Sequence, residues 1–367
     1  MHSIKSLRAL GLSSSSSLEG VSLALMETDG IDVYKITSQD TIPYDSDLRD
    51  KISHISKFDL EDEAHAEEIA TVEKELTEFY ASLVKEFIKD HEEEINIIGM
   101  EGHTLYFNPT RHKIKQIGDG KLLSKLTGLK VVSSFNKADI FAGGQGAPLY
   151  PVYHQALCGK LDKPIAIVNI GGVSGLTFLG SNGEVIAFNT GPGNAAINDW
   201  VYKKADMNMD YNGKLAITGK IDEKIVAILM RHKFFAQYPP KAVTKSVFKE
   251  KLEHLEGLSL EDGTATVTAF IAESIAYSTT FFLPEPVSKI IICGGGALNP
   301  TLLRFIRQRM PKTEVISGAE LDWSVNTIEA QAFAYLAVRR LFNLPGTFPS
   351  TTGALEPIIC GDVHEVQ

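Results

Sequence analysis

Residues 7–36 read LRALGLSSSSSLEGVSLALMETDGIDVYKI, and this stretch decides the fold class. Two apolar runs, Leu7–Leu12 and Val21–Met26, flank five serines, and a Thr-Asp-Gly turn leads to a third run, Ile31–Ile36, in which apolar and polar residues alternate. Apolar runs bounded by small polar residues are typical of strands joined by tight turns. The stretch therefore predicts three consecutive strands.

The same order returns at residues 165–188, which read IAIVNIGGVSGLTFLGSNGEVIAF. A buried strand (Ile165–Ile170) is followed by the tight turn Gly171–Gly172 and a second strand (Leu176–Leu179). A Ser-Asn-Gly turn then leads to a third strand (Val185–Phe188). Two copies of one pattern predict a duplicated lobe.

Helical patterns accompany these strands. Apolar residues recur at helical spacing in Leu60–His91, and the last third alternates helices with a strong strand. Such a mixture indicates an α/β protein with partly parallel sheets. A chain of 367 residues is about twice the common domain size. The further predicted elements are helices at Gly263–Phe282 and Thr327–Leu341, a strand at Lys289–Cys293, a loop at 346–353, and two lobes spanning 1–157 and 158–367.

The bulk composition narrows the classes of partner. A net charge of −10 argues against nucleic acid or an anionic membrane, because both require basic surfaces. The three cysteines are scattered and form no CxxC pair, so a reduced compartment is expected. No window approaches the roughly 18 apolar residues of a membrane span. We therefore expect a cytoplasmic protein that acts on small molecules.

Glycine-rich or serine-rich turns stand at the ends of several predicted strands, at 13–20, 171–172, 188–194 and 294–297. Such turns let backbone N–H groups approach phosphate oxygens, and a following helix adds partial positive charge. Together they predict a nucleotide site. The serine run has an alternative interpretation as a low-complexity linker. Glu19 is a candidate ligand of Mg²⁺, which prefers carboxylate oxygens and retained waters.

Several blocks resemble the anhydro-N-acetylmuramic acid kinase family. The likeness runs from about Leu10 to Gly353 in the family's order. It implies the two-lobed actin/hexokinase (ribonuclease H-like) fold, with duplicated mixed sheets flanked by helices and ATP in a central cleft. A homodimer is expected from the resemblance alone. The blocks are QIGD at 116–119, GGQGAPL at 143–149, NIGG at 169–172, TGPGN at 190–194, CGGG at 293–296 and EAQAFAYLAVRR at 329–340.

The resemblance implies phosphorylation of 1,6-anhydro-N-acetylmuramic acid by ATP and Mg²⁺, with water opening the anhydro ring. The product is N-acetylmuramic acid 6-phosphate, formed during peptidoglycan recycling. Asn189 and Glu329 stand at the catalytic positions, Glu19 at the metal position, and the adenosine motif lies in the second lobe. The implied cofactor-binding positions are Ser15, Ser16, Ser17, Leu18, Glu19, Gly20, Val21, Ser22, Gly171, Gly172, Gly294, Gly295 and Gly296, and the substrate-binding positions are Glu101, Gln145, Gly191 and Asn194.

The chain departs from the family at polar positions. The family's nucleotide turn resembles MSGTS-x-DG-x-D, where this chain has Ser13–Ser22. Asn189 replaces the aspartate that serves the family as the base for water, and an amide cannot take up a proton. The other departures are Glu101-Gly102-His103-Thr104 for HGQT, Ser134 and Asn136 for aspartate and arginine, Lys245 for arginine, and Asn326 for aspartate.

These departures leave three functions open. The first is the family's ring-opening kinase reaction, with a reduced rate. The second is a catalytically impaired relative that binds sugar or nucleotide without turnover, and the third is a kinase for an ordinary sugar hydroxyl. Glu101, His103 and Asp199 are candidates to replace the missing base, although local structural roles are the simpler interpretation for each.

Overall fold

A computed structural model describes residues 6–14, 18, 20–58, 63–89 and 94–366. The chain divides into two compact units, one formed by residues 1–160 together with 327–367 and the other by residues 161–326. This division differs from the predicted lobes 1–157 and 158–367 in its treatment of the C-terminal residues. Helix α10 (Ile328–Leu341) packs on strands of the N-terminal sheet, so residues 327–367 group with the first unit.

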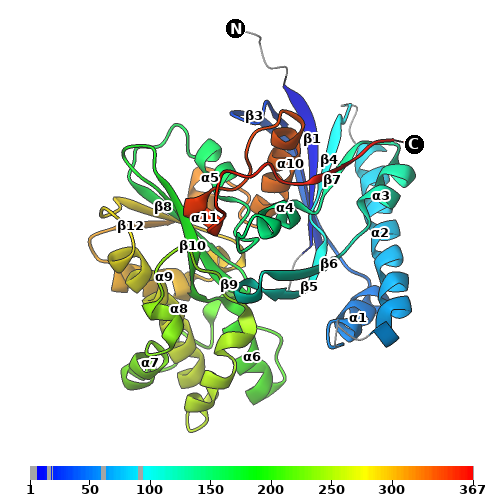
Figure 1. Cartoon of the computed structure of the whole chain (residues 1–367). Helices are drawn as coiled ribbons and strands as arrows, with labels where there is room; N and C mark the ends of the chain where they lie inside the picture. The colour runs from blue at the N-terminus through cyan, green and yellow to red at the C-terminus, as the bar shows by residue number, and fades with distance from the viewer. Residues whose placement is uncertain (1–5, 15–17, 19, 59–62, 90–93, 367) are drawn as a thin grey trace. The chain divides into compact units, whose positions relative to one another are not determined.

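The first unit is built on a mixed sheet that has six strands in the described part of the chain (Figure 1). Strand β1 pairs with β2 in antiparallel and with β4 in parallel orientation, and β2 pairs with β3 in antiparallel orientation. The predicted hairpin around the serines is confirmed, because Ser14 stands opposite Val21. The sheet order is β13 (Asp362–His364), β7 (Val131–Ser133), β4 (Ile97–Met100), β1 (Leu7–Ser14), β2 (Gly20–Thr28) and β3 (Val33–Pro43).

Helix α10 covers one face of this sheet, and glycines allow its close approach. A Cβ added to Gly11 of β1 would lie 1.7 Å from the backbone oxygen of Ala330, and one added to Gly99 of β4 would lie 2.0 Å from that of Phe333. Because no side chain fits in that space, glycine is required at both positions. These two glycines set the distance between α10 and the strands.

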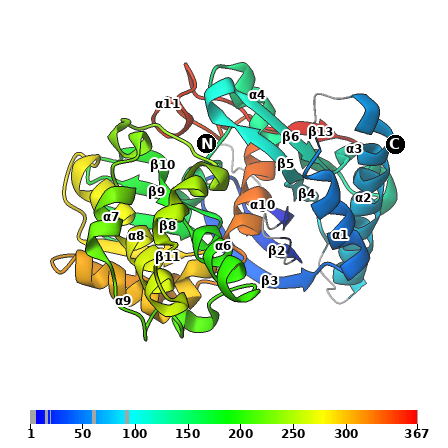
Figure 2. The same ribbon diagram turned by 90° about the horizontal axis from the view of Figure 1, so that it is seen from below.

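The opposite face carries the main core of the first unit. Leu10 and Leu12 of β1 are fully buried there and pack with the apolar side of α2. Helix α2 contacts both α1 and α3 (Figure 2). The predicted helix Leu60–His91 is found as α2, while its first residues fall among those that the structure does not describe. The bounds are α1 (Ser46–Ile55), α2 (Ala66–Lys89) and α3 (Gly120–Thr127).

A small antiparallel hairpin and short helices complete the first unit. The sequence patterns did not predict them, and the loop predicted at 346–353 contains the short helix α11. The hairpin consists of β5 (His103–Asn108) and β6 (Lys113–Ile117), and the short helices are α4 (Phe135–Phe141), α5 (Pro151–Leu157) and α11 (Pro349–Thr352).

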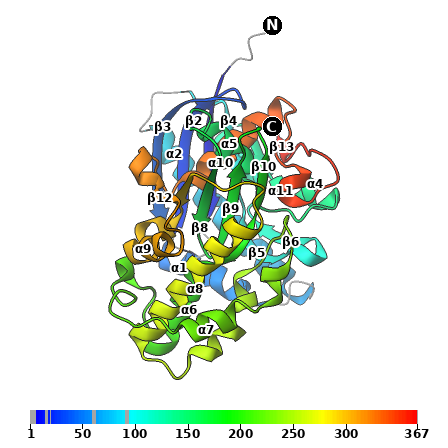
Figure 3. The same ribbon diagram turned by 90° about the vertical axis from the view of Figure 1, so that its left-hand side faces the viewer.

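The second unit repeats the same sheet plan (Figure 3). Its first strand pairs with the second in antiparallel and with the fourth in parallel orientation, as in the first unit. Both sheets place their third, second, first and fourth strands side by side, which confirms the predicted duplication and the ribonuclease H-like fold class. The sheet order is β10 (Val185–Pro192), β9 (Val173–Leu179), β8 (Ile165–Ile170), β11 (Lys289–Cys293) and β12 (Glu314–Ser317).

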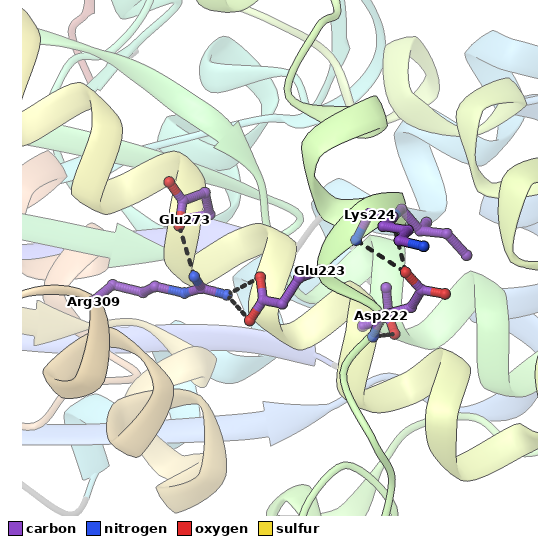
Figure 4. Close-up of polar contacts among 7 residues, drawn as sticks. Asp222, Glu223, Lys224, Glu273 and Arg309 are labelled. Carbon is purple, nitrogen blue, oxygen red and sulfur yellow. Dashed lines mark hydrogen bonds and ion pairs between the residues drawn. The ribbon is translucent and has the colours of Figure 1, made fainter.

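Four helices pack around the second sheet, and a cationic side chain ties three of them together. Arg309 at the end of α9 donates to both carboxylate oxygens of Glu223 at 2.7 Å, and its other terminal nitrogen lies 3.3 Å from Glu273 (Figure 4). Glu223 begins α7 and Glu273 lies in the middle of α8, so the guanidinium joins the end of α9 to both of these helices. The bounds are α6 (Asn194–Ala205), α7 (Glu223–Leu229), α8 (Leu260–Phe281) and α9 (Pro300–Arg309).

Within the described residues, no helix combines the length and the apolar character that crossing a membrane requires.

Candidate functional site

The serine turn of the first unit is only partly described. Ser15, Ser16, Ser17 and the predicted magnesium ligand Glu19 lie outside the described residues. Of their neighbours, Leu18 has a left-handed backbone with φ of 59°, and Gly20 begins β2. The side chain of Val21 is fully buried in the core, so only its backbone is available to a ligand, and the hydroxyls of Ser22 and Thr41 lie 3.0 Å apart.

A carboxyl pair lies beside the entry to this turn. Ser13 Oγ donates to Glu101 Oε2 at 2.6 Å, and the backbone N–H of Glu101 bonds to the carbonyl of Leu12. Burial raises the pKa of Glu101 well above its usual value, and the negative charge of Glu329 adds to this rise. The hydrogen bond from Ser13 opposes it. The structure thus brings the predicted positions Glu101 and Glu329 together within the first unit.

A second polar group centres on Ser14. Its Oγ lies 2.6 Å from Tyr44 Oη and 2.7 Å from His103 Nδ1, and all three side chains are buried. Buried polar networks of this kind fix the side chains that take part in them. Ser14 falls in the predicted turn 13–20, whereas Tyr44 was not among the predicted site residues, because a contact between residues so distant in sequence leaves no local pattern.

The GGQG loop is held by one buried carboxylate. Asp139 Oδ1 accepts the backbone N–H of Gly146 at 2.8 Å, and its Oδ2 accepts the hydroxyls of Thr347 and Thr352 at 2.6 and 2.5 Å. The N–H of Gln145, a predicted substrate-binding residue, donates to the carbonyl of Thr352 at 2.8 Å. The backbone of Gln145 is thereby positioned by the C-terminal segment.

In the second unit, the turn after β8 meets the start of α6. The N–H of Asn194 donates to the carbonyl of Gly171 at 2.7 Å, and the N–H of Gly193 donates to that of Gly172 at 3.2 Å. Asn194 Nδ2 also approaches the carbonyl of Ile170 at 3.4 Å. The sequence placed a turn at 188–194, whereas β10 continues to Pro192 and only Gly193 precedes the helix.

The GGGA segment after β11 lies against the end of β8, next to the turn just described. A Cβ added to Gly294, whose φ is 74°, would lie 2.6 Å from Asn169 Oδ1 and 2.8 Å from the carbonyl of Ile170. The first hydrogen bond of the following 3-10 turn runs from the N–H of Ala297 to the carbonyl of Gly294. The N–H groups of Gly295 and Gly296 therefore lie at the open start of that turn. The structure brings these predicted phosphate turns together at the carboxyl ends of β8 and β11.

Asn189 occupies a buried position on β10. Its backbone N–H donates to the carbonyl of Lys241 at 2.8 Å, and its Oδ1 accepts the N–H of Val243 at 2.9 Å. The side-chain oxygen therefore has a structural role, which leaves it one further lone pair. Gly191 follows a bulge in the pairing of β10 with β9, and a Cβ there would lie 2.9 Å from Ser274.

Lys241 is a buried cation surrounded by aromatic rings. Its Nζ lies 4.0 Å from the ring centre of Phe282 and 4.7 Å from that of Phe234, and it donates to the carbonyl of Phe234 at 3.2 Å. Only 4% of the residue is exposed, and burial lowers the pKa of its ammonium to about 8. The sequence identified Lys241 only as part of a Pro-Pro-Lys pattern, with no hint of this environment.

The turns after β8 and β11, together with the start of α6, fit a phosphate group. Bare turns, the start of a helix and the absence of side chains at Gly295 and Gly296 are features that accommodate anionic oxygens. Among the residues that the structure describes, no group of three His, Cys, Asp or Glu side chains forms a metal site. The predicted carboxylate for Mg²⁺, Glu19, lies outside the described residues.

Comparison with known proteins gives consistent matches along the chain. The family profile described as anhydro-N-acetylmuramic acid kinase matches residues 7–365. A protein of that name from Paramagnetospirillum magneticum is 39% identical over 360 residues, covering 97% of this chain and 99% of the relative. Another from Zymomonas mobilis is 39% identical over 373 residues, covering 98% and 100%.

Solved structures show a weaker likeness. The (R)-2-hydroxyglutaryl-CoA dehydratase component A from Acidaminococcus fermentans has a TM-score of 0.46 at 10% identity, covering 91% of this chain and 98% of that one. A ROK family glucokinase from Streptomyces griseus, solved with glucose and AMPPNP, has a TM-score of 0.39 at 12% identity, covering 90% and 99%. These values are too low to carry a statement about this chain.

Proposed function

This chain belongs to the anhydro-N-acetylmuramic acid kinase family, and we propose on that premise that it phosphorylates 1,6-anhydro-N-acetylmuramic acid from ATP. In the proposed reaction, water opens the anhydro ring while the γ-phosphoryl group is transferred to O6. The product is N-acetylmuramic acid 6-phosphate, which would enter peptidoglycan recycling. The observation that carries the proposal is the meeting of the turns at Gly171–Gly172 and Gly294–Gly296 with the start of α6.

The chain's own residues take distinct roles in this proposal. The glycine turns of the second unit bind the phosphates of ATP, since their backbone N–H groups can reach oxygens that no side chain shields. The serine turn from Ser15 to Ser22 contacts the nucleotide, and Glu19 holds Mg²⁺. When bound, MgATP supplies the phosphoryl group and screens its charge. Glu101, Gln145, Gly191 and Asn194 contact the sugar.

Asn189 stands at the position where the family has the aspartate that serves as the base for water. Asn189 orients the attacking water through the second lone pair of its Oδ1, while Val243 holds the side chain in place. An amide cannot remove the proton, so the proton of the attacking water passes to surrounding water, and the reaction is slower than with a positioned base. Glu329 is the carboxylate that we propose as the catalytic group beside the sugar, and Glu101, whose pKa is raised, holds a proton at its carboxyl group.

A second candidate function is binding of sugar and nucleotide without turnover. The observation that favours it is the buried amide of Asn189 at the base position, because losing a positioned base costs about 10²–10⁴ in rate. We also propose that the kinase acts in the cytoplasm, where ATP is available, and that it forms a homodimer. Sedimentation of the purified chain would test the dimer.

The test is release of ADP measured with three additions: 1,6-anhydro-N-acetylmuramic acid, N-acetylglucosamine and buffer. The proposed function predicts ADP release that depends on the anhydro sugar. Release with N-acetylglucosamine would instead identify a kinase for an ordinary hydroxyl. Saturable binding of the anhydro sugar and MgATP, with no release above the buffer rate, would establish the non-catalytic function and contradict the first.

A further inference from the structure

Residues 241–243 hold the side chain of Asn189 from the free edge of β10. The backbone N–H of Asn189 donates to the carbonyl of Lys241 at 2.8 Å, and the N–H of Val243 donates to Asn189 Oδ1 at 2.9 Å. Because a backbone N–H can only donate, the amide atom that faces Val243 is the oxygen. The position of residues 241–243 therefore sets the orientation of the Asn189 amide.

The sheet pairing of β10 is irregular at the same place. In the described part of the chain β10 is the outermost strand of its sheet, with β9 as its neighbour, and the register of this pair shifts between Asn189 and Gly191. A bulge interrupts the regular ladder and changes the direction of the side chains beside it. Residues 241–243 thus supply contacts to Asn189 where regular strand pairing stops.

The two ends of this segment are anchored in different ways. Val243 is 5% exposed and packs in an apolar cluster. Lys241 is 4% exposed, and its Nζ donates to the carbonyl of Phe234 at 3.2 Å. The ring centres of Phe282, Phe234 and Phe188 lie 4.0, 4.7 and 5.9 Å from this Nζ. Because a cation is attracted to the faces of aromatic rings, these contacts fix the ammonium group.

The three rings around the ammonium belong to three different elements. Phe188 directly precedes Asn189 on β10, Phe234 lies in the 3-10 turn at 233–236, and Phe282 follows the last residue of α8. Phe188 and Phe282 also contact each other edge to face, with ring centres 6.0 Å apart. Lys241 thereby ties its own segment to the strand that carries Asn189.

Stability alone does not explain a lysine at this place. Burial lowers the pKa of the Lys241 ammonium, and among the described residues no carboxylate forms an ion pair with it. Taking a charge out of water without a counter-charge costs free energy, which an apolar side chain would avoid. What the lysine adds is a directional hydrogen bond and contacts with ring faces. These contacts suit a residue that holds its backbone in one place.

We propose that Lys241 is a positioning residue, which acts through its own carbonyl and the N–H of Val243 to hold the amide of Asn189 in the orientation that the reaction uses. In this role Lys241 itself contacts neither the sugar nor the nucleotide. The proposal rests on the proposed function, in which Asn189 orients the attacking water. Two experiments keep the two apart, because one follows the hydrogen bond at Asn189 and the other follows turnover.

The first experiment measures amide hydrogen exchange by nuclear magnetic resonance in the wild type and in Lys241→Met, which removes the charge and the N–H groups. We expect the N–H of Val243 to exchange at least about tenfold faster in the variant, while the amides of β8 keep their wild-type rates. Phe282→Leu removes the nearest ring and should have the same selective effect to a smaller extent. Lys214→Met removes an exposed lysine of the same unit and should change neither rate.

Two results of this experiment would overturn the proposal. One is an unchanged exchange rate at Val243 in both Lys241→Met and Phe282→Leu. The other is exchange that becomes equally faster at Val243 and throughout β8, because it would show that Lys241 stabilises the whole unit rather than this segment.

The second experiment measures sugar-dependent ADP release in a double-mutant cycle. In the Asn189→Asp chain, whose carboxylate can keep the hydrogen bond from Val243, Lys241→Met should lower kcat at least about tenfold with little change in the KM for MgATP. In the Asn189→Ala chain, which has no side-chain oxygen to hold, Lys241→Met should change kcat by less than about twofold.

Equal losses of kcat in the Asn189→Asp and Asn189→Ala chains would overturn the proposal, because Lys241 would then not act through residue 189. If no chain of the cycle releases ADP, the proposed function fails. The exchange rate at Val243 then decides by itself whether Lys241 holds Asn189.

Discussion

The two sheets share one strand plan, yet the turns that follow their first strands differ in chemistry. In the second unit, Gly171–Gly172 offers backbone alone, and Gly294–Gly296 after β11 does the same. In the first unit the corresponding turn follows Ser13 and Ser14, whose hydroxyls bond to Glu101, Tyr44 and His103. The fold requires only the strands and the helices that cover them, so a duplicated plan can keep its shape while one turn changes its polar groups.

The buried charges differ in the same way. The first unit encloses an acid, Glu101, whose pKa is raised, and the second encloses a base, Lys241, whose pKa is lowered. Burial disfavours the charged form in both cases. Each unit thus holds a titratable group whose pKa burial shifts in favour of the neutral form, Glu101 beside Glu329 in the first unit and Lys241 beside Asn189 in the second.

The largest expected effect comes from restoring a carboxylate in the second unit. Asn189→Asp should raise the rate of sugar-dependent ADP release by about 10²–10⁴, because a positioned base contributes that much. The new carboxylate can still accept the N–H of Val243, so the fold should be kept. Asn182→Asp, which adds the same charge in an exposed turn, is the matched control. An unchanged rate would mean that a different group already serves as the base.

The next effect tests the glycine turns. Gly295→Val places a side chain over the start of the turn after β11, and a Cβ there meets only Asn194 Nδ2, at 3.2 Å. We expect binding of MgATP to weaken about 10- to 100-fold, since the side chain shields the N–H groups that phosphate needs. Gly257→Val is the control, because a Cβ at Gly257 meets nothing within 4 Å. If calorimetry shows that Gly295→Val binds MgATP with unchanged affinity, the nucleotide binds elsewhere.

A third variant concerns the buried lysine of the second unit, Lys241. The pKa of Lys241 is about 8 in the folded chain against 10.5 for an ordinary lysine. Between these pH values the unfolded chain binds more protons, so the free energy of unfolding rises with pH. Lys241→Met lacks this group, and the stability of the wild type relative to the variant should increase by about 1–3 kcal/mol from pH 8 to 10.5. Denaturant unfolding of the wild type and the variant at each pH measures this difference in the free energy of unfolding. A difference that does not change with pH would contradict the account.

The smallest expected effect concerns Glu101 of the first unit. Here the free energy of unfolding falls as pH rises, whereas for Lys241 it rises. The pKa of Glu101 is raised, so the folded chain holds a proton that the unfolded chain has already lost. Its contribution to stability is present at low pH and is lost as pH rises through the folded pKa. Glu101→Gln stays neutral, so it should gain stability relative to the wild type between pH 4.5 and 8. Parallel stability curves across that range would show that Glu101 is not held protonated.

Strong local patterns gave reliable predictions of strands. Ile165–Ile170 and Lys289–Cys293 have the predicted bounds, because wholly buried strands read as continuous apolar runs. The strand predicted at Val185–Phe188 is longer in the structure, since pairing with β9 continues past a bulge as far as Pro192. Helix α1 was missed although its buried residues Leu48, Ile52 and Ile55 stand at helical spacing, since the helix has only ten residues. The β5–β6 hairpin was missed because its strands are short and mostly not buried.

The candidate site was predictable only where backbone chemistry defines it. Glycine turns are visible in sequence, and the structure brings those of the second unit together. Hydrogen bonds such as Ser14 to His103 or Val243 to Asn189 join residues far apart along the chain, so no local pattern announces them.

The central claim is that this chain transfers a phosphoryl group to a sugar whose anhydro ring is opened by water. Incubation of 1,6-anhydro-N-acetylmuramic acid with MgATP in water enriched in oxygen-18, followed by mass spectrometry, tests it directly. The account predicts a sugar product that has gained one phosphoryl group and one oxygen-18 atom. Recovery of only the starting sugar, from both the wild type and Asn189→Asp, would contradict it.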